Sequence, residues 1–265
     1  MVKVFRSVLM LLVVVGLSIS SVYAAPEYSL ADALNDAGRQ RMLTQRILKL
    51  YTQIGLGVQQ PQAETELIDA VTLFDTQYQK LHQWQHEPKI AEQLERIGRI
   101  WGVYKERSLS KVNAPEAQKL LSISESLLSE SDRLVQLFEQ LAGTQAAALI
   151  NVSGRQRMLA QRMAKYYLLG SWGIETPAMS DKMDQVRLEF AAALLQLKSN
   201  TFNNAEIVER LARVEADWAW FNSAIQQPGR DRYNLVVLDA SEQLLRQLER
   251  LTHLYVEEGK KISHS

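Results

Sequence analysis

A cluster of arginines occurs twice in this chain of 265 residues, and arginine is a side chain that binds oxyanions and carboxylates. Residues 35–51 read NDAGRQRMLTQRILKLY, and 116 positions later residues 151–167 read NVSGRQRMLAQRMAKYY. A guanidinium group can donate two parallel hydrogen bonds to a carboxylate or an oxyanion. We therefore predict that Arg41 and Arg157 bind a small anion.

Both arginines lie on helical faces that are otherwise small or apolar. At helical spacing Arg41 shares its face with Ala37 and Leu48, and Arg157 shares its face with Ile150 and Ala164. Arginine is rarely buried on such a face unless a partner neutralises it. Neither residues 37–63 nor residues 140–174 contain Asp or Glu. The partner is therefore either a ligand or an acid from another helix.

Four further motif residues fit a supporting role in an anion site. Gln45 and Gln161 follow the arginines by one helical turn and could add a neutral hydrogen-bond donor. Gly38 and Gly154 precede the arginines by three residues. Because glycine lacks a Cβ atom, these positions would let a neighbouring backbone or a small ligand approach closely.

The alternative is that the arginines pair with acids of neighbouring helices and serve only the fold. The protein would then be a non-catalytic helical scaffold or adaptor, and loss of an arginine would leave a buried charge uncompensated. The acids available for such pairing include Asp75, Glu125, Asp132, Glu189 and Glu242.

The first 24 residues have the pattern of a secretory signal peptide. A basic start is followed by an apolar run and then by small residues up to Ala24. We predict cleavage after Ala24 and a periplasmic location, with an uncleaved membrane anchor as the alternative. Removing Lys3 and Arg6 leaves 28 basic and 30 acidic residues, which argues against a nucleic-acid partner. The chain has no cysteine, which excludes disulfides and thiol chemistry.

Composition and breaks in the pattern predict an all-α protein. Glycine and proline are scarce after the signal peptide, and the intervening residues are mostly good helix formers. We expect helices near residues 29–57, 61–85, 89–108, 115–170, 177–200, 204–226 and 231–258. Asn113 or Ala114, before Pro115, is the expected start of the fourth helix.

The repeat extends beyond the arginine motif. Phe74 and Phe190 share the offset of 116, Trp101 and Trp218 differ by 117, and residues 131–141 resemble residues 241–251 at an offset of 110. These echoes predict two tandem four-helix up-and-down bundles, residues 25–142 and 143–265. The long fourth helix, interrupted only by Gly143 and Gly154, would be shared between them.

If the bundles stack end to end, that shared helix holds Arg41 and Arg157 far apart. We then expect two separate sites, or one functional and one vestigial site. A joint site built by both arginines is the other arrangement, since a tandem duplication could supply both halves of a dimeric site from one chain.

Other residues give little support to catalysis or to metal binding. His82 and His86 lie four residues apart beside Glu87 but lack a third ligand, so we predict no metal site. Phosphate-loop, Ser/His/Asp and metalloprotease patterns are absent, so we predict no enzyme and no cofactor. We expect the tryptophans to be mostly core or junction residues, namely Trp84, Trp101, Trp172, Trp218 and Trp220.

The doubled sequence Gly-Arg-Gln-Arg-Met-Leu-x-Gln-Arg resembles the motif of the PilJ/NarX-type sensor domain, the periplasmic four-helix input module of chemotaxis transducers and nitrate sensors. The resemblance implies that Arg41 and Arg157 bind an anion across a dimer axis and that Arg46 and Arg162 support them. The chain differs at Gln40 and Gln156, where an apolar residue precedes the arginine in nitrate sensors.

The resemblance implies a sensor that binds a nitrate-like or carboxylate anion, and it allows a homodimer. We expect no second membrane span, kinase or methyl-accepting domain after Ser265. We therefore expect the protein to report occupancy to a separate membrane receptor or kinase, through two states that differ in ligand affinity.

Overall fold

The computed structural model describes residues 28–227 and 230–263, and all regular structure among them is helical. The all-α prediction is confirmed. The first repeat contains α1 (Leu30–Gly55), α2 (Gln60–Leu81), the short 3-10 turn η1 (His82–Trp84), α3 (Pro88–Ser108) and α4 (Ala114–Ala142). The second contains α5 (Gln145–Ser171), α6 (Pro177–Lys198), α7 (Ala205–Ala224) and α8 (Arg230–Ser263). The signal-peptide prediction lies outside the described residues.

Side-chain caps fix where several helices begin. Ser29 and Asp32 form a reciprocal capping box at the start of α1. Asn113 caps α4, where its side chain accepts a hydrogen bond of 2.9 Å from the backbone of Glu116. The predicted start before Pro115 is therefore confirmed.

The predicted continuous helix over residues 115–170 is wrong, because the chain reverses at Gly143. This glycine has a φ of 60°, in the left-handed region that ends helices. Thr144 then caps the next helix by accepting a hydrogen bond of 3.2 Å from the backbone of Ala147. α4 and α5 are thus separate helices.

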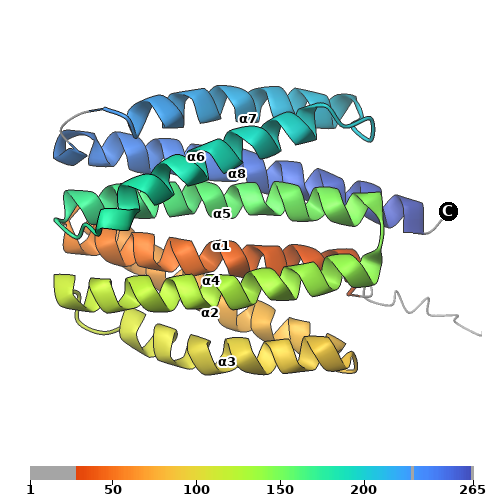
Figure 1. Ribbon diagram of the computed structural model, residues 1–265, viewed down its shortest axis with the longest axis horizontal. Helices are drawn as coiled ribbons and strands as arrows, with labels where there is room; N and C mark the ends of the chain where they lie inside the picture. The colour runs from red at the N-terminus through yellow and green to blue at the C-terminus, as the bar shows by residue number, and fades with distance from the viewer. Residues whose placement is uncertain (1–27, 228–229, 264–265) are drawn as a thin grey trace, which may run out of the picture.

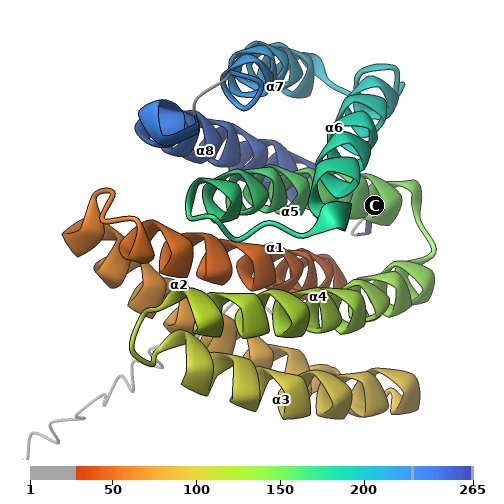
Figure 2. The ribbon, with the colours of Figure 1, turned by 60° about the vertical axis from the view of Figure 1, so that its left-hand side comes forward.

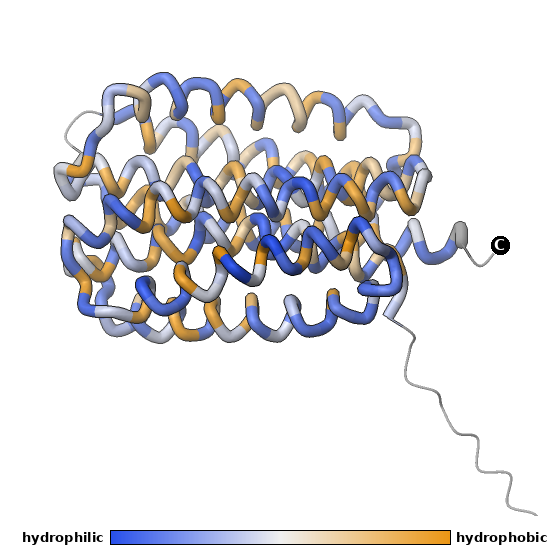
Figure 3. The backbone as a smooth tube through the Cα atoms, turned by 60° about the horizontal axis from the view of Figure 1, so that its bottom comes forward, coloured by the Kyte–Doolittle hydropathy of each residue, from blue (hydrophilic) through white to orange (hydrophobic). Residues whose placement is uncertain are grey.

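The two bundles lie side by side, and the end-to-end expectation is also wrong. α1 and α5 pack along each other at the centre of the molecule, as Figures 1 and 2 show. α1 also contacts α2, α4 and α8, while α5 also contacts α6, α8 and α4. The outer helices alternate between hydrophilic and hydrophobic segments (Figure 3), as expected for helices that cover a core. The motif helices therefore form the interface between the repeats.

Aromatic residues pack the same way in both repeats. Phe74 stacks on Trp101 with ring centroids 3.9 Å apart, and Phe190 stacks on Trp218 at 4.2 Å. Trp220 is the exception among the tryptophans, since it is 59% exposed, whereas the others are buried or packed against the core.

Trp172 closes one end of the interface between the repeats. A Cβ atom placed on Gly55, at the end of α1, would lie only 2.1 Å from the Trp172 ring. The ring therefore occupies the space that glycine leaves.

Among the described residues, no helix combines the length and apolarity needed to cross a membrane.

Candidate functional site

Arg41 of α1 is buried and pairs with an acid of its own repeat. Its Nη1 atom lies 2.6 Å from Asp132 Oδ1 on α4. Its Nη2 atom donates a hydrogen bond of 3.1 Å to the carbonyl of Asn151, on α5 of the other repeat. One guanidinium group thus joins α1, α4 and α5.

Arg157 of α5 has the equivalent arrangement. Its Nη1 atom lies 2.9 Å from Glu249 Oε2 on α8. Its Nη2 atom donates to the side-chain oxygen of Asn35 on α1, at 3.0 Å. Each motif arginine therefore pairs with an acid of its own repeat and reaches the motif asparagine of the other.

The two arginines are brought together, contrary to the expectation that a shared helix would hold them apart. A Cβ atom on Gly154 would lie 3.2 Å from Arg157 Nη2 and 3.7 Å from Arg41 Nη2. A Cβ atom on Gly38 would lie 3.4 Å from Arg157 Nη2. The motif glycines do permit a close approach, but arginine side chains make it.

Two outer arginines complete this charge cluster. Arg39 pairs with Glu249 across the interface, and Arg155 Nη2 lies 3.8 Å from Asp132 Oδ2. These four arginines and their two acids are called the arginine cluster below, namely Arg39, Arg41, Arg155, Arg157, Asp132 and Glu249. The cluster contains more cations than acids.

The neighbouring arginines favour the charged form of Glu249 in this cluster. Burial alone would raise the pKa of Glu249, but Arg157 and Arg39 lower it to about 2. Burial lowers the pKa of Arg41 to about 10 despite its contact with Asp132, and this value still leaves the guanidinium charged at neutral pH. The pairs are therefore ionic.

Gln45 and Gln161 are both buried but have different surroundings. Gln45 Oε1 accepts a hydrogen bond of 2.6 Å from Lys165 Nζ, across the interface, and Gln45 Nε2 donates to Thr44 at 2.9 Å. Gln161, beside Ala160 instead of a threonine, has no hydrogen-bond partner for either side-chain polar atom. The two copies of the motif are thus chemically unequal.

The later motif arginines pair with acids across the interface. Arg46 and the buried Lys49 both contact Glu242 on α8, and Arg46 Nη2 lies 2.8 Å from Glu66. In the second repeat Arg162 and the buried Lys165 both contact Glu125 on α4, and the Lys165 distance is 2.6 Å. The buried lysines were missed as site residues from sequence.

The equivalent ion pairs of the two repeats show which residues of α4 correspond to which residues of α8. Glu125 corresponds to Glu242 and Asp132 corresponds to Glu249, both at an offset of 117. The echo at 110 is therefore displaced by seven residues. This displacement explains why Glu249 was absent from the acids predicted as partners.

Gln40 and Gln156, which depart from the nitrate-sensor pattern, have a structural role. Their side-chain amides donate to the backbone carbonyls of Phe74 and Phe190, at 3.2 and 3.0 Å. Each glutamine thus fastens a motif helix to the next helix of its repeat.

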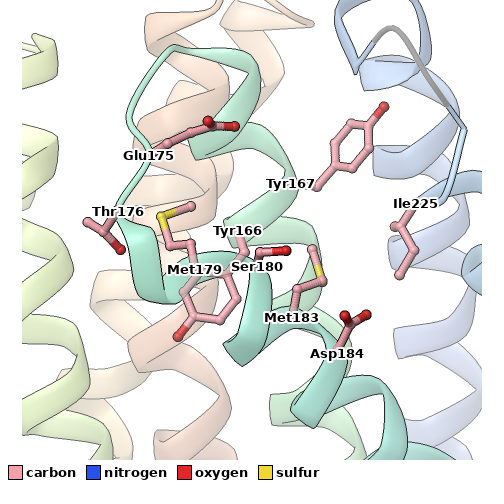
Figure 4. Close-up of a pocket in the computed structure, with 9 residues that line it drawn as sticks. All are labelled: Tyr166, Tyr167, Glu175, Thr176, Met179, Ser180, Met183, Asp184 and Ile225. Atoms are coloured by element: carbon pink, nitrogen blue, oxygen red, sulfur yellow. The ribbon is translucent and has the colours of Figure 1, made fainter.

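A cavity of about 310 Å³ lies away from the arginine cluster, between the end of α5, the start of α6 and the end of α7 (Figure 4). Tyr166 forms part of its wall, and its hydroxyl lies 3.1 Å from Arg162 Nε and 3.3 Å from Glu125. The other lining residues are Tyr167, Glu175, Thr176, Met179, Ser180, Met183, Asp184 and Ile225. Neither Arg41 nor Arg157 contributes to this wall.

A second cavity of about 260 Å³, between α1, α2 and α8, is bordered by Arg39 and Arg46 together with Glu66 and Glu249. Glu66 and Glu249 are the partners of those arginines, and Asp69 is a further acid on the wall. Within the described residues, no group of three or more His, Asp or Glu side chains is arranged to hold a metal ion.

Comparison with protein families identifies the domain. The model of the PilJ family, type IV pili methyl-accepting chemotaxis transducer N-terminus, matches residues 27–127 and again residues 142–244. The chain belongs to the PilJ family. It carries two tandem copies of this sensor-type domain. Comparison with curated proteins and with solved structures gives no match.

Proposed function

We propose that this PilJ protein is an exported, periplasmic sensor-type module whose motif arginines act as internal ion pairs, and that it acts on a separate membrane receptor or kinase. The observation that carries the proposal is the burial and pairing of both arginines. Arg41 and Arg157 are at most 1% exposed, and each contacts a carboxylate. Asp132 and Glu249 thus occupy the positions that an anionic ligand would need.

The pairing also suggests what the tandem copies are for. In the nitrate sensors that this chain resembles, the motif helix of each subunit meets its equivalent across a homodimer axis. Here α1 and α5 of one chain pack along each other, and their arginines contact the motif asparagine of the opposite copy. We propose that one chain replaces such a dimer, and that a signal consists of a displacement of one repeat against the other.

A second candidate is a small anion bound at the arginine cluster. The Nε atoms of Arg41 and Arg157 are buried and have no hydrogen-bond partner. The cluster also has a surplus of arginines over acids. An anion would have to displace a carboxylate to reach the guanidinium groups.

Thermal unfolding separates the two candidates. Residues 25–265 are heated with nitrate, nitrite, sulfate, phosphate or small carboxylates at fixed ionic strength. Under the ion-pair proposal no anion selectively raises the midpoint of the wild-type protein. Asp132→Asn, which frees Arg41, is destabilised and regains stability with formate or acetate.

An anion receptor behaves differently. A specific ligand would stabilise the wild-type protein by about 2.7 kcal/mol at a hundredfold excess over its dissociation constant. Loss of that shift in Arg41→Ala or Arg157→Ala, with a folded variant by circular dichroism, would overturn the ion-pair proposal and establish the second candidate.

A further inference from the structure

The outer face of α6 carries an apolar strip that no described helix covers. Leu188 and Leu195 are 72% and 68% exposed, the highest values among the large hydrophobic residues of the described chain. Ala191 and Ala192 lie between them and are also exposed. The spacing i, i+3, i+4, i+7 places all four on one helical face. We call these four residues the α6 strip.

The neighbours of α6 leave this face open. Among the described helices, α6 contacts α5 and α7. Its buried side chains, such as Phe190 and Leu197, lie on the opposite side of the helix from the α6 strip. Figures 1 and 2 show α6 crossing α5 obliquely at the edge of the molecule.

The first repeat serves as an internal control. The positions of α2 that correspond to the α6 strip at an offset of 116 are polar, namely Thr72, Asp75, Thr76 and Gln79. Asp75 accepts hydrogen bonds from Trp101 and Lys105 of α3, whereas its counterpart is Ala191. The common fold therefore does not require an apolar surface here, and the two repeats differ in this feature.

The next helix differs between the repeats in the same direction. The exposed residues Ala212 and Ala216 of α7 correspond to Glu95 and Arg99 of α3 at an offset of 117. Trp220, also on α7, is 59% exposed. At Ala212 and Ala216 the second repeat is thus less polar than the first, whereas Trp220 corresponds to Val103, which is apolar and 47% exposed.

We propose that the α6 strip binds the same strip of a second copy of this chain, with the two α6 helices antiparallel. In that arrangement a two-fold axis passes between Ala191 and Ala192, and Leu188 of each copy faces Leu195 of the other. Leucine meets leucine, and the alanines let the helix axes approach to about 8 Å.

The charges at the two ends of α6 suit this antiparallel arrangement. Asp181 and Asp184 are exposed near the start of the helix, and Lys198 is exposed at its end. Asp184 lies about as far before the proposed axis as Lys198 lies after it. In the antiparallel pair Asp184 of each copy lies near Lys198 of the other, in addition to their pairs with Arg187 and Glu215 within one chain, whereas a parallel pair would bring equal charges together.

The strip is only one helix wide. The contact would therefore bury less area than a standard interface, which buries about 800 Å² per partner. We therefore expect reversible dimerisation in the micromolar range. This dimer does not use the motif helices, since α1 and α5 already pack on each other within one chain. The inference stands independently of the proposed function.

Sedimentation velocity over a concentration series of residues 25–265 tests for the dimer. We expect a monomer–dimer equilibrium in the wild-type protein and a monomer at all concentrations for Leu188→Glu/Leu195→Glu. The matched control is Thr72→Glu/Gln79→Glu, at the corresponding exposed positions of α2, which should dimerise like the wild type. Circular dichroism confirms that both variants are folded.

Cross-linking tests the register, because the chain has no cysteine of its own. Leu188→Cys mixed with Leu195→Cys should give a cross-linked dimer with a short bismaleimide, while each variant alone should not. Cross-linking of each variant with itself would overturn the antiparallel pairing. A wild-type protein that stays monomeric, or that binds lipid vesicles through Leu188 and Leu195 instead, would overturn the second copy as occupant.

Discussion

Glu249 is a residue on which two arginines of different repeats converge. It contacts Arg157 of its own repeat and Arg39 of the other. Removing its charge would leave Arg157, which is fully buried, without its carboxylate partner. A buried cation without its counter-charge is costly, because the protein interior cannot solvate it as water does.

We therefore expect Glu249→Gln to lower the free energy of unfolding by roughly 2–4 kcal/mol, somewhat less than for a fully buried pair because its side chain is 27% exposed. Urea unfolding at neutral pH measures the change. Glu209→Gln is the control, since Glu209 pairs only with the exposed Arg213 one turn along α7, and it should change stability by about 0.5 kcal/mol or less. Equal effects of the two variants would show that Glu249 contributes no more than a surface charge.

At the scale of helices, the C-terminal end of α1 packs against the C-terminal end of α5. Gly55 lets the Trp172 ring lie against the α1 backbone. Gly55→Ala should cost roughly 1–3 kcal/mol, because the ring has to move out of a close-packed site. Gly102→Ala is the control, since nothing lies within 4 Å of its added Cβ, and it should stabilise the protein by up to about 1 kcal/mol.

Differential scanning calorimetry of both variants checks this prediction. A stabilised Gly55→Ala protein would mean that Trp172 can leave α1 without loss, and that the ring does not hold the repeats together.

Glycines also show how far the helices could be predicted from sequence. Helix formers between the breaks located most elements, and the start of α4 at Asn113 was predicted. Gly143 and Gly154 both appeared as weak interruptions of one long helix, yet the first ends α4 and the second lies inside α5. The distinguishing signal was Thr144, a residue that begins helices, directly after Gly143.

The partner of Arg157 could not be predicted for a different reason. A shift of seven residues returns nearly to the same face of a helix, so the apolar pattern of α8 fits offsets of 110 and 117 almost equally well. Only the packing of α8 against α5 selects the second offset and brings Glu249 to the arginine. The sequence could therefore predict buried arginines in need of acids, but not which acid each one receives.

At the scale of the whole molecule, each repeat supplies charges that the other needs. Glu242 of the second repeat contacts Lys49 of the first, and Glu125 of the first contacts Lys165 of the second. Both lysines are at most 1% exposed. We therefore expect the repeats to unfold in one transition, because separating them would leave buried charges unpaired.

Glu242→Gln tests this coupling by native-state hydrogen exchange. The slowest amides of α1 and α5 should lose protection by the same free energy, although the substitution lies in the second repeat. Glu209→Gln, which affects an exposed pair within α7, should leave both unchanged. Loss of protection confined to α5 and α8 would show that the repeats open independently.

The same carboxylates make stability depend on acid pH. Burial alone would raise the pKa values of Glu125, Glu242 and Glu249, but neighbouring cations lower each to about 2 from 4.5. A lowered folded pKa gives stability that is present above the unfolded value and is lost as pH falls toward the folded value. Each acid should account for a loss on the order of 2–3 kcal/mol over this range.

Urea midpoints measured from neutral pH down to about pH 2 should therefore be level above about pH 5 and fall steeply below it. Glu125→Gln should be less stable than the wild type at neutral pH but should lose less stability on acidification, because one of the three linked protons is removed. A wild-type midpoint that stayed level down to about pH 2.5 would contradict the ionic pairing, since protonation of the unfolded chain must then be matched in the folded protein. Because Glu125 and Glu242 each hold a buried lysine of the opposite repeat, acid should separate the repeats and unfold them together.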